Sequence, residues 1–342
     1  MHVNHDDAGS VTMDDASGAL AGLRSCAVGR LDADTALPVV VTPTEPLPLA
    51  GYQDDIDRAT GAYLSTVGGI LFRGFPVDSA ADFEAMVKRI SPDLASYEFG
   101  STPRSQVHNQ IYTSTEYPPH QHIPLHNEQA YTTEWPMKIW FYCAQAPPEG
   151  GYTPIADSRE VYRHVPSRIR ERFVEKGVMY VRNYGNGLDV PWTKVFNTMD
   201  RGVVERFCRA AGITYEWKPD GELRTRQVCQ AVAVHPRTNE AVWFNQAHLF
   251  HVSNLEPAVR EALLSVVSEA DLPRQACYGD GTPIDAAVLD EIRDVYRCHA
   301  VQFPWQRGDV LMLDNMLAAH GRTPFKGPRK ILVAMAESSK NE

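Results

Sequence analysis

The chain contains 342 residues, of which 43% are hydrophobic and 22% charged, a globular composition that excludes a mainly disordered, collagen-like or coiled-coil chain. Its 33 basic and 43 acidic residues give a formal net charge of −10, which argues against nucleic acid or an anionic membrane as the main partner. The six cysteines form no CxxC pair, so we expect free thiols in a reducing compartment. The N-terminus does not resemble a secretory signal, and no apolar run approaches the roughly 20 residues that span a bilayer. We therefore expect a soluble, cytoplasmic protein.

The predicted elements alternate along the chain without a strict βαβ rhythm. Residues 1–36 are rich in Asp, Ala, Gly and Ser and lack an apolar period, which predicts a mobile N-terminal tail. Residues 37–342 contain no linker-like stretch, so we expect a single domain. Capping residues followed by an apolar face predict helices at 79–90, at 157–177 with a restart at Pro166, at 257–267 and at 285–298. Apolar runs predict strands at 69–75, 139–143, 178–183, 228–234, 240–244, 310–313 and 331–335. Many short strands with long insertions indicate a β-sandwich or barrel core with helices outside.

A candidate metal site begins with His126-Asn127-Glu128, an H-x-E triplet. The triplet alone is weak evidence, because a second triplet of the wider H-x-[DE] pattern, His5-Asp6-Asp7, occurs in the tail. In an extended segment, residues two apart point to the same face, so His126 and Glu128 can bind one metal. His320 follows the apolar run 310–313 and is the candidate third ligand. Two imidazoles and a carboxylate on one face form the facial triad of non-haem Fe(II) oxygenases, with zinc as the chemical rival.

Further ordered stretches surround these ligands, at 69–75, 124–128, 150–158, 243–248 and 320–329. With them the chain resembles the taurine dioxygenase-like (TauD/TfdA) family of Fe(II)/2-oxoglutarate dioxygenases, and within it the amino-acid hydroxylases of the syringomycin-biosynthesis type. The resemblance implies an α+β fold with a double-stranded β-helix (jelly-roll or cupin-like) core and surrounding helices. It also implies Fe(II), O₂ and 2-oxoglutarate, which is decarboxylated to succinate and CO₂.

The resemblance further implies an anchor for the distal carboxylate of 2-oxoglutarate. The family places an arginine shortly after the second histidine, and Arg329 lies nine residues after His320. It places a threonine about 25 residues after the acidic ligand, which is the position of Thr153. An arginine fork suits a carboxylate better than lysine does, and Lys330 alternates to the opposite face of its strand. Most family members carry Asp where this chain carries Glu128, and we expect the facial triad to be kept.

The substrate implied by the resemblance is a small amino-acid-like molecule, free or tethered to a carrier protein, that is hydroxylated at an unactivated carbon. Candidate substrate or pocket residues are Tyr117, Gln121, His122, Asn245, Gln246 and Arg322. Each of them has an ordinary loop or turn role as the alternative, and Arg322 could also contact 2-oxoglutarate. His248 and His251 are close enough in sequence to suggest a second metal, but a core or capped-loop role is favoured.

Several other activities are compatible with the same residues. The predicted ligand set also supports desaturation or epoxidation, and cleavage of a sulfonate or aryloxy ether after hydroxylation beside the heteroatom. Family members that halogenate lack the acidic ligand, so Glu128 favours hydroxylation over halogenation. A non-catalytic metal-binding scaffold is disfavoured because all five candidate ligand and anchor residues are intact. A zinc-dependent hydrolase is a weaker alternative.

Overall fold

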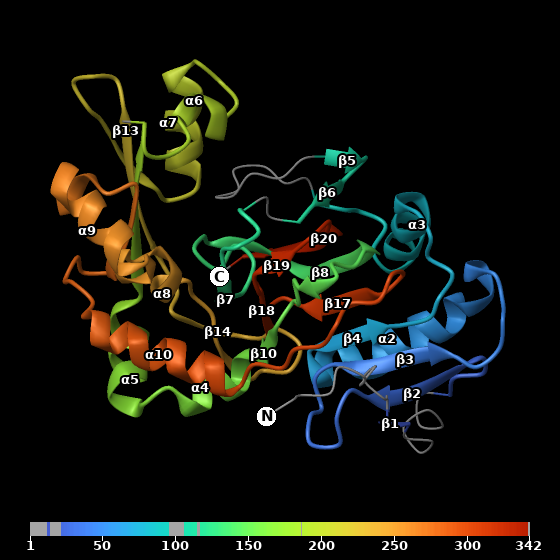
Figure 1. Ribbon diagram of the computed structural model, residues 1–342. Helices are drawn as coiled ribbons and strands as arrows, with labels where there is room; N and C mark the ends of the chain where they lie inside the picture. Colours follow the sequence, from blue (N-terminus) through green and yellow to red (C-terminus); the bar gives the residue numbers. More distant parts are fainter. Residues whose placement is uncertain (1–11, 14–21, 96–105, 115–116, 186, 341–342) are drawn as a thin grey trace.

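A sheet of nine strands forms the larger half of the core in the computed structural model, which describes residues 12–13, 22–95, 106–114, 117–185 and 187–340 (Figure 1). The strand order is β1-β2-β3-β4-β17-β8-β20-β6-β5. Neighbouring strands are antiparallel except for the parallel pair β3 and β4. In that order the strands are Thr12–Met13, Cys26–Arg30, Val39–Pro43, Gly69–Phe72, Val310–Asp314, Glu134–Gln145, Lys330–Lys340, Ile111–Thr113 and Gln106–His108.

The central strands read as continuous apolar runs because both of their faces are covered. On β17, Met312 belongs to the apolar cluster that includes the helices on the outer face, whereas Leu311 and Leu313 belong to a second cluster on the inner face. Ile155 and Ala318 of a smaller sheet lie in this inner cluster. Burial on both sides explains why these segments were predicted as strands from composition alone.

The smaller sheet has three strands, β10 (Ile155–Asp157), β18 (Ala318–Arg322) and β7 (Ile123–His126), with β18 in the middle. In the register of this sheet, His320 lies opposite both Ile155 and His126. The two facing sheets form the predicted double-stranded β-helix, and the predicted α+β class with surrounding helices is confirmed. The sheet places two of the candidate ligands on neighbouring strands.

Helices cover the outer face of the main sheet. These are η1 (Leu49–Tyr52), α2 (Gln53–Val67) and α3 (Ala80–Ile90). The capping box predicted at Ser79 is confirmed, because its hydroxyl accepts from the amide of Asp82 and the Asp82 carboxylate accepts from the amide of Ser79. Helix α2 was missed because it begins without a side-chain cap, so the sequence lacks a start signal there.

The predicted N-terminal tail is wrong for residues 22–36. Strand β2 pairs along its whole length with β3, and Cys26 and Val28 are buried in the core. The carboxylate of Asp55 on α2 accepts hydrogen bonds from the amides of Arg24 and Ser25, which fixes the entry to the strand. A five-residue strand is too short to give a clear alternating pattern. The remaining tail residues, 1–11 and 14–21, lie outside the described residues.

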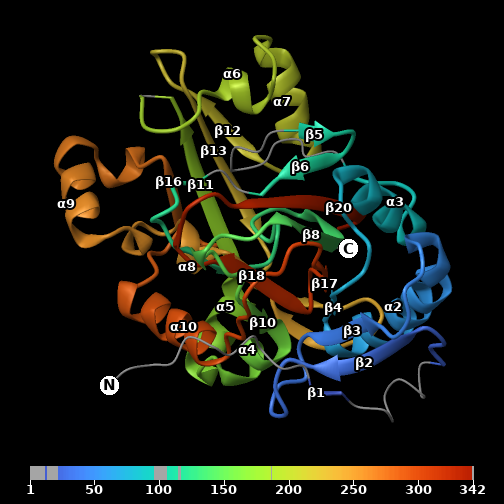
Figure 2. The ribbon, with the colours of Figure 1, turned by 45° about the vertical axis from the view of Figure 1, so that its right-hand side comes forward.

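Residues between β10 and β17 build a four-stranded sheet beside the β-helix core, as Figures 1 and 2 show. We call it the second sheet. Its order is β12-β13-β11-β16, namely Thr214–Trp217, Leu223–Cys229, Val178–Tyr184 and Arg274–Tyr278. Around it lie α4 (Ser158–His164), α5 (Ser167–Lys176), α6 (Trp192–Val195), α7 (Arg201–Ala210), α8 (Ala247–Phe250), η2 (Val252–Asn254), α9 (Pro257–Val266), η3 (Glu269–Asp271) and α10 (Ala286–Cys298). A small hairpin joins β14 (Val232–Val234) to β15 (Ala241–Trp243), and β9 (Glu149–Gly150) pairs antiparallel with the sequence-distant β19 (Phe325–Lys326).

The predicted helices in this region are confirmed, including the restart at Pro166 and the end at Gly177. The predicted strand at 228–234 is divided into β13 and β14. The break lies at Gln230, whose side-chain amide donates to the carbonyls of Ala130 and Thr132 near the candidate metal site. This tertiary contact overrides the local strand preference.

The predicted free thiols are confirmed, and four of the six cysteines are buried. Burial raises the pKa of the Cys229 thiol to about 12, so this thiol stays protonated at neutral pH. Among the helices of the described ranges, none has the length and apolar character that crossing a bilayer requires.

Candidate metal centre

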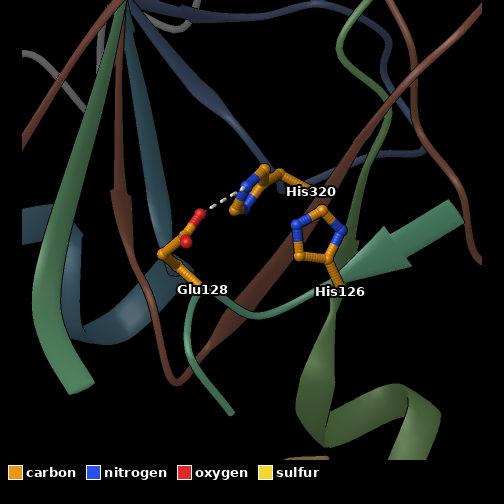
Figure 3. Close-up of side chains that lie close together, drawn as sticks. All are labelled: His126, Glu128 and His320. Carbon is orange, nitrogen blue, oxygen red and sulfur yellow. Dashed lines mark ion pairs between the residues drawn. The ribbon is translucent and has the colours of Figure 1, made fainter. Parts of the chain in front are cut away.

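Three candidate ligands converge at the smaller sheet. His126 is the last residue of β7, Glu128 follows two residues later, and His320 lies on the neighbouring strand β18. One ligand atom from each of them lies within 4.8 Å of the others. Figure 3 shows the Glu128 carboxylate directed at the His320 ring, with its Oε2 3.8 Å from Nε2. The longer Glu side chain therefore still reaches the two histidines, and the arrangement is able to hold a metal ion.

A backbone contact sets the orientation of the first histidine. His126 Nδ1 lies 2.8 Å from the carbonyl oxygen of Pro124, which can only accept, so Nδ1 carries the proton. The neutral ring then presents the lone pair of Nε2, as metal-bound histidines commonly do. The His320 ring is held by packing, with ring centroids 4.6 Å from His126 and 4.9 Å from Phe141.

Asn315 holds the backbone on which the acidic ligand sits. Its side-chain oxygen accepts from the Glu128 amide at 2.7 Å, and its side-chain nitrogen donates to the Glu128 carbonyl at 2.9 Å and to Pro136 at 2.8 Å. Asn127, between the two ligands, donates to Ser158 and to the Asn315 carbonyl. Both asparagines are fully buried. Sequence reasoning missed this support, because only the fold brings Asn315 beside Glu128.

Asn315→Ala is expected to lower both stability and metal affinity. The substitution leaves one amide and two carbonyls buried without their partner, at a cost of about 3 kcal/mol of unfolding free energy. Fe(II) affinity should fall about 10- to 100-fold, as is usual when a group that supports a metal ligand is lost. Urea unfolding of the apoprotein and an anaerobic Fe(II) titration measure the two effects. Unchanged metal affinity in a destabilised variant would show that Asn315 serves only the fold.

A pocket opens beside the histidines. It is lined by Ser114, Ile123, His126, Phe141, Thr153, His320, Gly321, Arg322, Arg329 and Val333. The fold thus brings both predicted 2-oxoglutarate anchors to one cavity with two of the three candidate ligands. Thr153 is almost fully buried, and its hydroxyl accepts from the indole nitrogen of Trp305 at 3.2 Å, which leaves the hydroxyl proton to donate to a ligand.

Arg329 is one of the two arginines that line this pocket. Its guanidinium donates from Nε to the Gly151 carbonyl at 3.0 Å and from Nη1 to the Ser114 hydroxyl at 3.3 Å. Within the described ranges, no carboxylate forms an ion pair with it. Burial, together with the positive charge of Arg322, lowers the pKa of Arg329 to about 10. A partly buried guanidinium whose hydrogen bonds go to neutral acceptors fits a dianionic ligand that would supply the missing charge.

The two glycines that precede Thr153, Gly150 and Gly151, adopt a backbone conformation that favours glycine. Both residues have positive φ angles, 69° and 68°. A Cβ atom on Gly150 would lie 2.2 Å from the Pro324 carbonyl oxygen. Only glycine permits this close approach of the β9 turn to β19, and the approach places the Gly151 carbonyl under Arg329.

Arg322 fastens the loop that borders the pocket. Its guanidinium donates to the carbonyls of Tyr117, Pro118 and Gln121 at 2.8–3.0 Å. The alternative in which Arg322 holds the loop is therefore what the structure shows, although the same side chain also lines the pocket. Tyr117 is partly buried, whereas Gln121 and His122 are exposed on this loop.

Asn245 and Gln246 lie behind the candidate ligands rather than among the residues that line the pocket. Asn245 uses its amide to bind the Ala231 carbonyl and the Ala247 amide, which is the turn role. Gln246 donates from its side chain to the carbonyl of Asn127 at 2.7 Å, so it supports the segment between the two ligands.

His248 and His251 form no second metal site with each other. His248 is buried, its Nε2 donates to the Leu125 carbonyl at 2.9 Å, and burial lowers its pKa to about 3. His251 caps η2 by accepting from the Ser253 amide, and burial lowers its pKa to about 4. The expected core and capped-loop roles are confirmed.

Comparison with known proteins places the chain in a family. The family model described as "Taurine catabolism dioxygenase TauD, TfdA family" matches residues 38–335. The dapdiamide synthesis protein DdaC of Enterobacter agglomerans is 42% identical over 274 residues, which cover 80% of this chain and 83% of that protein. A clavaminate synthase-like protein of Arabidopsis thaliana is 34% identical over 281 residues, which cover 79% of this chain and 82% of that protein.

Among solved structures, PvcB of Pseudomonas aeruginosa aligns with a TM-score of 0.53 and 14% identity, covering 98% of this chain and 94% of that one. This likeness shows that the fold is shared. The match of the family model over most of the chain, together with the two relatives, identifies the chemistry. The chain therefore belongs to the TauD/TfdA family and is an Fe(II)- and 2-oxoglutarate-dependent dioxygenase.

Proposed function

We propose that His126, Glu128 and His320 bind Fe(II), that Arg329 and Thr153 anchor 2-oxoglutarate, and that the enzyme hydroxylates an unactivated C–H bond of an amino-acid-like substrate. One observation carries this proposal: the histidines that lie with Glu128 in a candidate metal site also line a pocket with the partly buried Arg329, which pairs with no carboxylate of the described residues. The donor set of two imidazoles and one carboxylate is that of non-haem Fe(II) oxygenases, and it leaves ligand positions for a keto acid and O₂.

Each residue has a distinct task in this proposal. Iron with 2-oxoglutarate and O₂ supplies the oxidising power. His126 presents Nε2 because Pro124 holds the proton on Nδ1. Asn315 fixes the backbone of Glu128, and Arg329 with Thr153 orients the co-substrate by its distal carboxylate. The carboxylate of Glu128 fills the position that a halide ion would need, so we propose hydroxylation rather than halogenation.

The substrate class rests on the relatives. DdaC is described as a dapdiamide synthesis protein, which supports a role for this chain in the biosynthesis of an amino-acid-derived natural product. We propose a small amino-acid-like substrate, either free or tethered to a carrier protein. Desaturation or epoxidation would use the same ligand set and is the alternative outcome of the same cofactor chemistry.

An anaerobic visible spectrum tests the two proposed sites before any substrate is known. Adding 2-oxoglutarate to the Fe(II) protein is expected to produce a metal-to-ligand charge-transfer band, because the keto acid chelates the metal only when both sites are present. Matched titrations with succinate, which lacks the keto group, are the control and should give no band. Bound iron without a band after 2-oxoglutarate addition would contradict the assigned co-substrate pocket.

A further inference from the structure

Two arginines and a threonine form a row across the second sheet. Arg182 on β11 is paired with Arg274 on β16 and with Thr225 on β13, so the three side chains share one face of the sheet. Thr225 and Arg182 are 5% and 8% exposed, and Arg274 is partly buried. Neighbouring strands are about 4.8 Å apart, so the two arginines leave the sheet from adjacent positions.

Arg182 is a buried cation that faces no ion-pair partner among the described residues. Its guanidinium lies 4.7 Å from the centre of the Tyr184 ring, and its buried Nε has no hydrogen-bond partner. Asp189 pairs instead with Arg274, at 3.3 Å and 3.4 Å. In the part of the chain that the structure describes, no carboxylate forms an ion pair with Arg182. Burying a charge without a partner is costly, and like charges directly opposite on a sheet destabilise it.

The row lies in a polar seam between two apolar clusters on the same face. Tyr180, two positions before Arg182, belongs to the cluster around α4, α5 and α8, whereas Tyr184, two positions after it, belongs to the cluster of α6 and α7. The fold could have filled this seam with an apolar residue. An anion bound between the two clusters would offset the free-energy cost of burying the Arg182 charge there.

Contacts connect this face to the candidate metal centre. The Tyr180 hydroxyl accepts from the Gln246 amide at 2.7 Å, and the Gln246 side chain donates to Asn127, the residue between two candidate ligands. Arg274 lies 5.8 Å from the centre of the Phe250 ring, which in turn lies 5.0 Å from the ring of Tyr131, three residues after Glu128. The second sheet therefore turns its arginine row toward the side of the core that carries the metal ligands.

We propose that Arg182, Arg274 and Thr225 form a subsite for a carboxylate of the substrate, at the end remote from the reacting C–H bond. Two planar forks and a hydroxyl are the groups that bind a carboxylate best. This inference rests on the proposed function and narrows its substrate to a carboxylate-bearing molecule. The phosphodiester of a carrier arm offers a similar charge, but it has chain on both sides, whereas a terminal carboxylate can enter a buried seam.

Thermal unfolding of Arg182→Met tests the subsite without knowledge of the substrate. Methionine keeps much of the volume and removes the uncompensated charge, so the melting temperature should rise by about 2 °C. Arg226→Met is the matched control on the opposite face of the same sheet, where the side chain is 39% exposed, and its melting temperature should not change. A fall in the melting temperature of Arg182→Met would show that Arg182 holds the fold, which overturns the proposal.

Ligand probes on the anaerobic Fe(II)–2-oxoglutarate complex then identify the anion, because the Arg329 pocket is already filled. At constant ionic strength, acetate should raise the melting temperature of the unsubstituted protein but not of Arg182→Met, whereas neutral acetamide should affect neither. An equal response of both proteins to acetate, or no response, overturns the subsite. A larger, Arg182-dependent response to methyl phosphate assigns the anion to a carrier arm and overturns the carboxylate.

The charge-transfer band of Arg182→Met should match that of the unsubstituted protein, so a missing band in both would count against the proposed function and not the subsite.

Discussion

His126→Ala is expected to reduce turnover that depends on Fe(II) and 2-oxoglutarate by about 10³-fold or more, with the chain still folded. Loss of a group that merely supports a metal ligand costs 10- to 100-fold, and loss of the ligand itself should cost more. His126 lies at the end of β7 and is only partly buried, so its removal opens little space in the core. Without it, Glu128 and His320 remain as two ligands, which is too few to hold Fe(II) firmly.

The measurement is succinate formation with and without Fe(II), together with the charge-transfer band and circular dichroism. His164→Ala is the matched control, because His164 is an exposed histidine on α4 that contacts Glu160 of its own helix. Its activity should equal that of the unsubstituted enzyme. Near-normal turnover in His126→Ala would show that the metal site is assigned to the wrong residues.

Arg329→Lys should produce the second largest effect, an increase of about 10- to 100-fold in the KM for 2-oxoglutarate. Charge-assisted hydrogen bonds contribute about 1.5–3 kcal/mol each, and lysine replaces a bidentate fork with a point charge. The acceptors at Gly151 and Ser114 were also arranged for the guanidinium, so the ammonium satisfies them less well. The kcat at saturating 2-oxoglutarate should change less than the KM, because the chemistry at iron is unaltered.

The pH dependence of the KM for 2-oxoglutarate shows whether the charge of residue 329 contributes to binding, apart from the shape of its side chain. Burial and Arg322 lower the pKa of Arg329 to about 10, so wild-type Arg329 stays charged from pH 6.5 to 8.5 and its KM should be flat. The same burial lowers the pKa of a lysine from a reference near 10.4, so the variant loses its proton earlier as pH rises. Its KM should therefore increase from pH 6.5 to 8.5. Parallel KM profiles for both proteins would contradict a direct contact between residue 329 and the dianion.

Local signals in the sequence determined much of the fold. Residue types that favour helix ends and the apolar faces of helices act within a few residues, which is why α3, α5 and α10 were predicted close to their observed bounds, although of these only α3 has a side-chain capping bond. The central strands were predicted because continuous burial leaves an uninterrupted apolar run. Helix α2 and strand β2 were not predicted, since neither carries such a signal and both are held by packing against distant elements.

The candidate ligand set was also predicted from the sequence, because the i, i+2 spacing of His126 and Glu128 is a local property of an extended chain. Only the tertiary structure brought His320 and Arg329 to the same pocket as His126. It also decided between alternatives that residue type left open: Asn245 stabilises a turn, and Arg322 holds a loop.

The supporting residues lay beyond sequence reasoning for a physical reason. Asn315 is 187 positions from Glu128, and its hydrogen bonds form only when β17 and β7 belong to one folded core. Arg182 and Arg274 become neighbours only through the pairing of β11 with β16. The sequence by itself determined which side chains could carry the chemistry, whereas long-range pairing of strands decided which of them meet.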